Sequence, residues 1–137
     1  MAEAPGRVVV VGDILTDVVA VLSGPLATGS DTAATITVGG GGQAANTAAW
    51  LARLGVPVTL VGAVGADGPG DARLAELAAA GVGCAAVRRA GVGTGSVVVL
   101  VDGVERTMVT DRGATLTLAA ADIDASRASK PEATHLH

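Results

Sequence analysis

The sequence contains almost no aromatic side chains, since it has no Phe or Tyr and its only Trp is Trp50. Proteins that bind single-stranded nucleic acids stack bases on aromatic side chains, and this chain lacks such a platform. Basic residues are also few, with 9 Lys and Arg against 13 Asp and Glu and a net charge of −4. Because binding to the phosphate backbone requires a basic surface, no nucleic-acid partner is expected.

Cysteine and long apolar runs are scarce as well. Cys84 is the only cysteine, so no internal disulfide can form and a reducing compartment is expected; the side chain itself is predicted to be a small buried apolar group. No apolar run approaches the roughly 20 residues of a membrane span. The N-terminal segment shows no small-residue cleavage site after its short apolar run, so no signal peptide is expected. These features predict a cytoplasmic domain without a membrane contact.

Half of the 137 residues are hydrophobic, which suffices for one domain with a core. Residues 7–12 (RVVVVG) form a β-branched run, typical of a strand that is buried on both faces of a parallel sheet. Ligands of open α/β sheets bind beyond the carboxyl ends of such strands, which makes Asp13 and Asp17 candidate ligand-binding residues. The alternative is that one of them, Asp13 above all, only hydrogen-bonds the loop backbone.

Alternating polar and apolar residues predict two half-exposed strands, at 18–22 and 32–38, before the first helix. We expect them to project from the main body as a hairpin or small sheet. A second hairpin is predicted at 94–101 and 105–110, because Asp102-Gly103 between these runs is typical of a tight turn.

Two helices are predicted between the hairpins. The first covers 43–54 and ends at Gly55; the second covers 71–80, with Asp71 as its N-cap. In the second helix, one face is predicted to carry Leu74, Leu77 and Ala78. The remaining predictions are buried strands at 58–61 and 84–87, a linker at 118–124 and a further strand that begins at 134. This order is that of an α/β protein with an antiparallel accessory.

Four consecutive glycines, 39–42, stand between the strand at 32–38 and the first helix. Glycine costs backbone entropy and packs no side chain, so the run predicts a turn that a ligand or another segment approaches closely. Residues 39–44 match the dinucleotide pattern G-x-G-x-x-A, but that fingerprint belongs after the first buried strand. A triphosphate loop is excluded because no Lys or Ser follows the glycines.

A clamp for a hydroxyl-rich ligand is a further interpretation of the glycine run. The glycine N–H groups and the amides of Gln43 and Asn46 can hydrogen-bond hydroxyls, and the Asp17 carboxylate can accept from two adjacent hydroxyls at once. The alternative, that the glycines only permit tight packing of helix on strand, stays open.

Several linked motifs resemble the N-terminal region of the ribokinase-like (PfkB) carbohydrate kinase family. They are GGQAAN at 41–46, Gly55 at the helix end, GADGPG at 65–70 and VVVVGDILTD at 8–17. The resemblance covers essentially the whole chain. It implies a Rossmann-like three-layer core, incomplete here, with a small β-sheet lid formed by strands within 17–38 and 95–110. Residues 1–137 would then be the N-terminal portion of a single ribokinase-like domain.

The resemblance also implies a reaction and a site: transfer of a phosphoryl group from ATP, with Mg²⁺, to a hydroxyl of a sugar or sugar-like substrate. Asp17 would hold sugar hydroxyls, and Asp13 would lie near the pocket. The other implied substrate-binding residues are Gly41, Gly42, Gln43 and Asn46, with Val98 and Met108 as apolar walls from the lid.

The chain departs from the family pattern after the lid. It has no D-T-x-G-A-G-D motif, which carries the family's catalytic aspartate, and no N-x-x-E segment. The only acids there are Asp111, Asp122, Asp124 and Glu132, and none has a glycine context. Phosphoryl transfer depends on metal ions and positioned donors, so no catalytic residue is expected in this chain, and we expect it to be inactive alone and to bind neither ATP nor Mg²⁺.

Two other functions remain open from the sequence. One is a shortened, non-catalytic relative that binds a sugar or pairs with a partner, including a second copy of itself, through the exposed lid edge. The other is a dinucleotide-binding domain. A metal site is not expected, since His135 and His137 would share one strand face but provide too few ligands for a closed zinc site.

Overall fold

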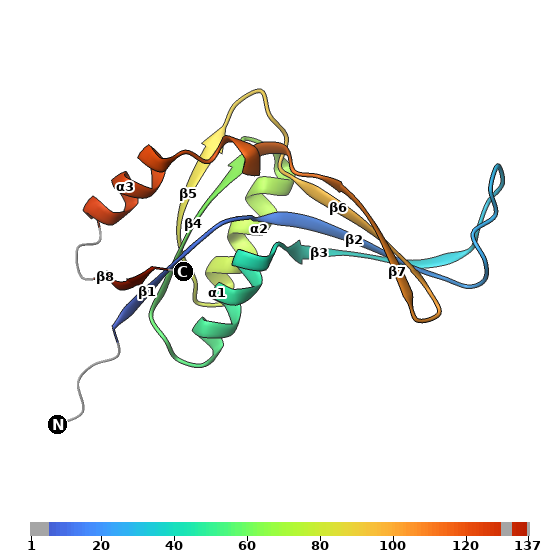
Figure 1. Ribbon diagram of the computed structural model, residues 1–137, viewed down its shortest axis with the longest axis horizontal. Coiled ribbons are helices and arrows are strands. Elements are labelled where there is room, and N and C mark those ends of the chain that lie inside the picture. The colour runs from blue at the N-terminus through green and yellow to red at the C-terminus, as the bar shows by residue number, and fades with distance from the viewer. Residues whose placement is uncertain (1–5, 130–132, 137) are drawn as a thin grey trace.

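The computed structural model describes residues 6–129 and 133–136 and consists of an α/β body from which a second sheet projects (Figure 1). In chain order the elements are β1 (Arg7–Val11), β2 (Leu15–Leu22), β3 (Ala34–Gly41), α1 (Gln43–Arg53), β4 (Val58–Gly65), α2 (Gly68–Ala79), β5 (Gly83–Arg89), β6 (Ser96–Asp102), β7 (Glu105–Asp111), the 3₁₀ helix η1 (Gly113–Thr117), α3 (Ala120–Ser129) and β8 (Ala133–Leu136).

The sheet of the body has the order β5-β4-β1-β8, and all of its strand pairs are parallel. Every residue of β4 is buried, as expected for a strand covered on both faces. β8 pairs with β1, which confirms the core strand predicted to begin at residue 134. His135 lies in this strand, whereas His137 lies outside the described residues. The predicted α/β class is confirmed.

The core lies between this sheet and the helices α1 and α2. Small residues of α1 are buried against the sheet and let the helix approach it closely: Ala44, Ala45 and Ala48. Leu77 of α2 joins the same cluster, with Val10, Leu60 and Val64 from the strands. On β4, Val61 and Ala63 are also fully buried.

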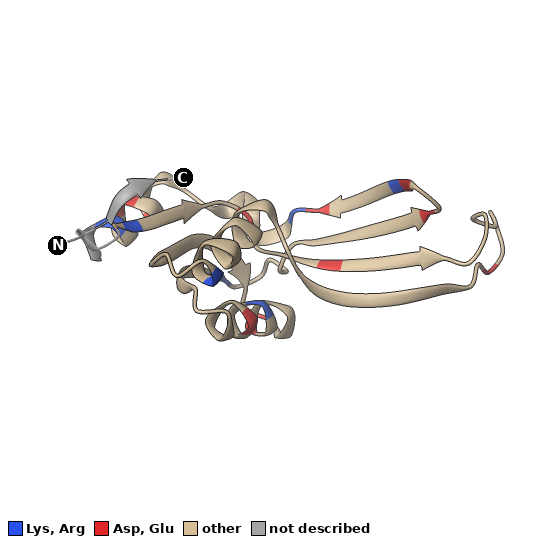
Figure 2. Ribbon diagram, turned by 90° about the horizontal axis from the view of Figure 1, so that it is seen from below, with Lys and Arg blue, Asp and Glu red and all other residues tan. Residues whose placement is uncertain are grey.

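The projecting sheet has the order β3-β2-β6-β7. β2 runs antiparallel to β3 and parallel to β6, while β6 and β7 form the predicted hairpin. Figure 2 shows that charged residues are few along this sheet. Both predicted projecting strand pairs are therefore present, and β2 joins them into one sheet.

The glycine run differs from its prediction as a turn. Gly39, Gly40 and Gly41 are the last residues of β3, where Gly39 pairs with Asp17 and Gly41 with Leu15. Only Gly42, the N-cap of α1, has a positive φ, of 98°. The strand continues because β2 also begins earlier than predicted and supplies pairing partners for the glycine backbone.

The second helix begins earlier than predicted, and its cap is a different residue. α2 starts at Gly68 with Asp67 as its N-cap, so the prediction of Asp71 was wrong. The buried positions of α2 are Gly70, Arg73 and Leu77, whereas Ala78 is exposed. Leu74 and Leu77 pack against the core cluster as predicted, but the third inward residue is Arg73 and not Ala78.

Two further predictions are corrected. Helix α3 occupies most of the predicted linker, and Asp122 stabilises its start by accepting from the Ala119 N–H (2.8 Å) and pairing with Arg89 (2.8 Å). Cys84 is exposed rather than buried, because β5 is an outer strand of the sheet.

Within the described residues, no helix has the length and apolar character required to cross a membrane.

Candidate functional site

Helix α1 and the projecting sheet border an open hollow of about 450 Å³, which we call the sheet hollow. Strand β2 brings Asp17 to it, the loop after β1 brings Asp13, and α1 brings Gln43 and Asn46. The complete lining is Asp13, Leu15, Asp17, Gly42, Gln43, Asn46, Thr47, Trp50, Val97, Val99 and Met108. Most of the polar residues that the sequence predicted for a ligand site therefore converge here.

Asp13 binds the start of α1. Its Oδ1 accepts from the Ala44 N–H (3.0 Å), and its backbone carbonyl accepts from the Ala45 N–H (3.3 Å). A Cβ on Gly42 would lie 2.5 Å from the Asp13 carbonyl oxygen, so glycine is required there by space as well as by its positive φ. Asp13 thus hydrogen-bonds the backbone, the alternative considered from the sequence, and it also lines the sheet hollow.

Asp17 lies over the glycine backbone of β3. A Cβ on Gly41 would collide with its carboxylate, which explains why this strand position carries glycine. Burial raises the pKa of Asp17, the nearby Arg73 lowers it and the charge of Asp13 raises it, with a net upward shift. The site therefore holds a partly desolvated carboxylate.

Helix α1 presents a polar edge to the sheet hollow. Gln43 and Asn46 are exposed at its first turn, and Trp50 follows one turn later, 63 % exposed. Arg53 lies over the Trp50 ring at 5.5 Å from its centroid. Thr47 and Trp50 were not predicted from the sequence. They lie one helical turn after Gln43 and Asn46, and this spacing indicates that all four share one edge of the helix.

The opposite wall of the sheet hollow is apolar. Met108 contributes to it as predicted, together with Val97 and Val99. Val98 does not line the hollow, because Val97 pairs with Asp17 and neighbouring residues of a strand point to opposite faces. The prediction of Val98 was wrong by one residue in register.

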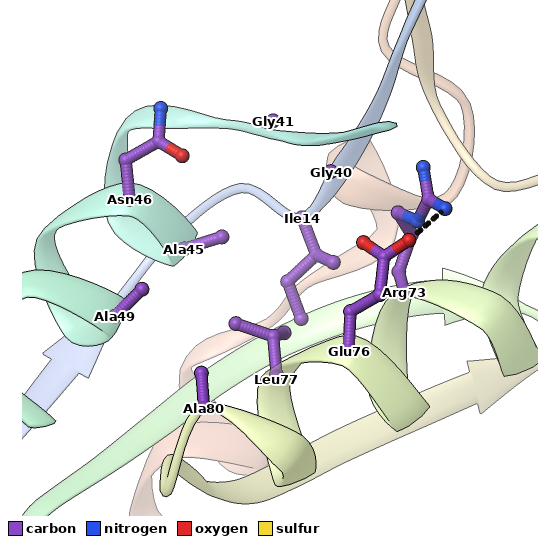
Figure 3. Close-up of a pocket in the computed structure, with 10 residues that line it drawn as sticks. All are labelled: Ile14, Gly40, Gly41, Ala45, Asn46, Ala49, Arg73, Glu76, Leu77 and Ala80. Carbon is purple, nitrogen blue, oxygen red and sulfur yellow. Dashed lines mark hydrogen bonds and ion pairs between the residues drawn. The ribbon is translucent and has the colours of Figure 1, made fainter. Parts of the chain in front are cut away.

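Gly41 lines a second, smaller hollow of about 180 Å³ between α1 and α2, which we call the helix hollow (Figure 3). Figure 3 shows Arg73 and Glu76 of α2 on one side of it and Asn46 and Ala49 of α1 on the other. The full lining is Ile14, Gly40, Gly41, Ala45, Asn46, Ala49, Arg73, Glu76, Leu77 and Ala80. The glycine end of β3 and Asn46 thus border both hollows.

The GADGPG segment lies outside both hollows and anchors the chain. Asp67 Oδ1 accepts from the Gly70 N–H (2.8 Å) and the Thr94 hydroxyl (2.6 Å), while Oδ2 accepts from the Thr94 N–H (2.9 Å). These hydrogen bonds, the Thr94 hydroxyl first, lower the pKa of Asp67. Asp67 therefore joins the start of α2 to the segment that leads into β6.

The arrangement suits a small, hydroxyl-bearing ligand. The sheet hollow combines two carboxylates, two amides and the N-terminal end of a helix on one side with an apolar wall on the other, which is the usual make-up of small-molecule sites. Among the residues that the structure describes, no group of three or more His, Cys, Asp or Glu is placed to hold a metal ion.

Comparison with known proteins extends these observations. The family model "pfkB family carbohydrate kinase" matches residues 6–137. A search of curated protein sequences gave no match. Many solved structures match, among them a ribokinase from Giardia lamblia with 24% sequence identity and a TM-score of 0.87, for which the alignment covers 96% of this chain and 44% of that one.

Two similar structures contain nucleotides according to their descriptions. A fructokinase with bound ATP from Xylella fastidiosa is 32% identical, with a TM-score of 0.70 and coverage of 90% of this chain and 39% of that one. A ribokinase from Cryptococcus neoformans var. grubii serotype A in complex with ADP is 30% identical, with a TM-score of 0.69 and coverage of 82% and 35%. This chain spans less than half the length of each of the three.

Proposed function

This chain belongs to the pfkB family of carbohydrate kinases, and from that premise we propose that it supplies the sugar-binding and lid portion of an ATP-dependent sugar kinase. The observation that carries the proposal is the sheet hollow, where Asp13, Asp17, Gln43 and Asn46 meet between α1 and the projecting sheet. In this proposal the projecting sheet is the lid, with its strands within 17–38 and 95–110.

Asp17 is the central residue of the proposed sugar site. Its carboxylate accepts hydrogen bonds from two neighbouring hydroxyls, and charge-assisted bonds of this kind are stronger than neutral ones. Gln43 and Asn46 each offer a donor and an acceptor to further hydroxyls, and Gly41 and Gly42 let the ligand approach the backbone. Val97, Val99 and Met108 contact the apolar face of the sugar ring.

In this proposal the nucleotide site and the catalytic residue lie outside these 137 residues. The chain has no triphosphate loop and no D-T-x-G-A-G-D motif, and its described residues contain no group of three or more His, Cys, Asp or Glu placed to hold a metal ion. No step of phosphoryl transfer is therefore assigned to a residue of this chain. The names of two similar proteins include ATP and ADP, which supports ATP as the donor in the complete protein.

We further propose that the projecting sheet pairs with a second copy in a homodimer. The face of this sheet turned away from Asp17 exposes large apolar side chains: Ile36 is 62 % exposed, Val38 65 % and Val109 61 %. Contiguous apolar surface of this kind marks an interaction site. A second copy also covers the unpaired strand edges.

The test of the enzymatic proposal is ATP consumption by the full-length gene product with a panel of pentoses, hexoses and nucleosides. We expect sugar-dependent turnover by the full-length product and none by the 137-residue chain. Turnover by the 137-residue chain alone would contradict the location of the catalytic parts outside it. Loss of sugar dependence in the full-length product would contradict the function itself.

The site is tested by the substitution Asp17→Asn in the full-length product. Sugar affinity measured by calorimetry is expected to fall roughly 10- to 100-fold, because a charged acceptor of hydrogen bonds becomes a neutral amide. Asp31→Asn, in an exposed loop, is the matched control and is expected to leave the affinity unchanged. Equal affinities of wild type and Asp17→Asn would place the sugar elsewhere.

A further inference from the structure

Arg73 is an unusual residue for its position, because it is a cation with only 6 % exposure on a helix that faces the core. A buried charge is costly unless it is paired and hydrogen-bonded. Its Nη1 donates to the carbonyl oxygen of Gly39, and its Nη2 donates to Glu76 Oε1 (2.7 Å), as Figure 3 shows for the second pair. Its Nε has no partner among the described residues. The burial of this side chain therefore requires an explanation beyond packing.

Gly39, whose carbonyl oxygen accepts from Arg73, lies opposite Asp17, the residue proposed to bind the sugar. Gly39 pairs with Asp17 across β2 and β3, so Arg73 binds the backbone of the residue opposite that carboxylate. Glu76 reaches the same strand, since a Cβ on Gly40 would lie 2.8 Å from Glu76 Oε2. The glycine end of β3 is thus enclosed by the Asp17 carboxylate at Gly41 and by the Arg73–Glu76 pair at Gly39 and Gly40.

These contacts also explain why glycine occupies positions 40 and 41. A side chain at Gly41 would displace Asp17, and one at Gly40 would displace Glu76. The glycine backbone therefore lies between the Asp17 carboxylate, which lines the sheet hollow, and the Arg73–Glu76 ion pair, which lines the helix hollow. Arg73 therefore acts on Asp17 in two ways, through its bond to the Gly39 backbone opposite that carboxylate and through its charge.

We propose that Arg73 is a positioning residue for the sugar site: it fixes the glycine end of β3 through the Gly39 carbonyl, and its charge holds the Asp17 carboxylate ready for sugar hydroxyls. This inference rests on the proposed function, and it assigns Glu76 the task of orienting the guanidinium. Arginine suits the role better than lysine, because its planar group bonds a carbonyl and a carboxylate at once.

The charges around Asp17 set the direction of the pH effect. The charged neighbours are Asp13 from the loop after β1 and Arg73 from α2, which is itself paired with Glu76. The neighbours from β3, β6 and α1 carry no charge: Gly39, Gly41, Val97, Gln43 and Asn46. Burial and Asp13 raise the pKa of Asp17, and Arg73 opposes both. Without Arg73, Asp17 takes up a proton at a higher pH and loses its acceptor role there.

The test is the substitution Arg73→Met in the full-length gene product, with kcat and KM for sugar and ATP measured across pH. We expect sugar kcat/KM to fall by about 10- to 100-fold, as for other losses of positioning, mainly through KM for the sugar. The acidic limb of its pH profile should move to higher pH, while KM for ATP stays the same. Arg127→Met, on the exposed surface of α3, changes the same charge and is expected to match wild type.

Arg73→Lys separates charge from geometry and serves if Arg73→Met does not fold. It should keep the acidic limb of wild type and still raise the sugar KM, since one ammonium cannot reproduce the two directed bonds. The inference would be overturned if Arg73→Met kept both the wild-type sugar KM and the wild-type acidic limb of the pH profile. It would also be overturned if Arg73→Lys kept the wild-type sugar KM. In either case an active wild type leaves the proposed function intact, whereas a wild type without sugar-dependent turnover argues against that function.

Discussion

The sugar-binding role proposed for Asp17 comes with a cost to the fold. Burial is the largest influence on its pKa and raises it from 3.8 in spite of Arg73. Because the folded-state pKa of Asp17 exceeds the unfolded-state value, the folded protein binds more protons at pH values between the two. Its stability therefore falls as pH rises through the folded-state pKa. Near neutral pH the ionised carboxylate therefore opposes folding, which is common where function requires a buried charge.

The substitution Asp17→Asn is accordingly expected to raise the melting temperature at neutral pH while it weakens sugar binding. The gain should shrink as pH falls through the raised pKa of Asp17, since the wild-type carboxyl is then also neutral. Thermal unfolding followed by circular dichroism across pH measures both effects, with Asp31→Asn as the exposed control. A lower melting temperature at neutral pH would show that the carboxylate is stabilised by its neighbours.

At the scale of elements, the joint between the body and the projecting sheet depends on Asp67. Its two oxygens bind the Gly70 N–H at the start of α2 and both donors of Thr94 ahead of β6. The Thr94 hydroxyl also accepts from the Gly65 N–H (2.9 Å) at the end of β4. This network of hydrogen bonds around one carboxylate thus connects three elements, so the GADGPG segment has a structural role outside the proposed sugar site.

Asp67→Ala is expected to reduce the free energy of unfolding by about 1–2 kcal/mol, because a helix cap and a link between elements are lost. The lowered pKa of Asp67 means that its contribution is present above the unfolded-state pKa and is lost as pH falls through the folded-state value. Urea unfolding at neutral and acidic pH tests this, and Asp71→Ala, whose carboxylate is on the surface, is the comparison. Equal stabilities of Asp67→Ala and wild type at neutral pH would refute the role.

At the scale of the whole molecule, the projecting sheet is unusual in having apolar residues on both faces. One face borders the sheet hollow with Val97 and Val99, and the other exposes Ile36 and Val38. An exposed apolar face of a sheet requires a partner for stability in water. The proposed homodimer supplies that partner without obstructing the face that carries Asp17.

Ile36→Lys is expected to shift the full-length gene product from dimer to monomer, because it places a charge in the middle of the apolar face. Sedimentation velocity over a range of concentrations measures the change. Leu116→Lys is the matched control, since Leu116 is 72 % exposed on η1. A wild type that is monomeric at all concentrations, or a dimer that tolerates Ile36→Lys, would exclude this interface.

Local patterns were sufficient for much of the fold. The β-branched run at 7–12, the Asp102-Gly103 turn and the alanine-rich helix that ends at Gly55 each encode their own element, because strand and helix periodicities are read over a few residues. The same local reasoning grouped Asp13, Gln43 and Asn46, which line one hollow, since they follow a strand or open a helix.

Contacts distant in sequence decided the remainder. The choice of Val97 and Val99 over Val98 depends on how β6 is paired with β2, and a slip of one residue inverts every side chain. The extension of β3 through its glycines, the burial of Arg73 and the bonds of Asp67 to Thr94 depend on residues that only folding brings together. Sequence by itself determined the elements and the types of residue at the site, because these follow from short-range periodicity and chemistry. Tertiary structure alone decided which faces meet and which charges share a site, because pairing register and burial are properties of the assembled chain.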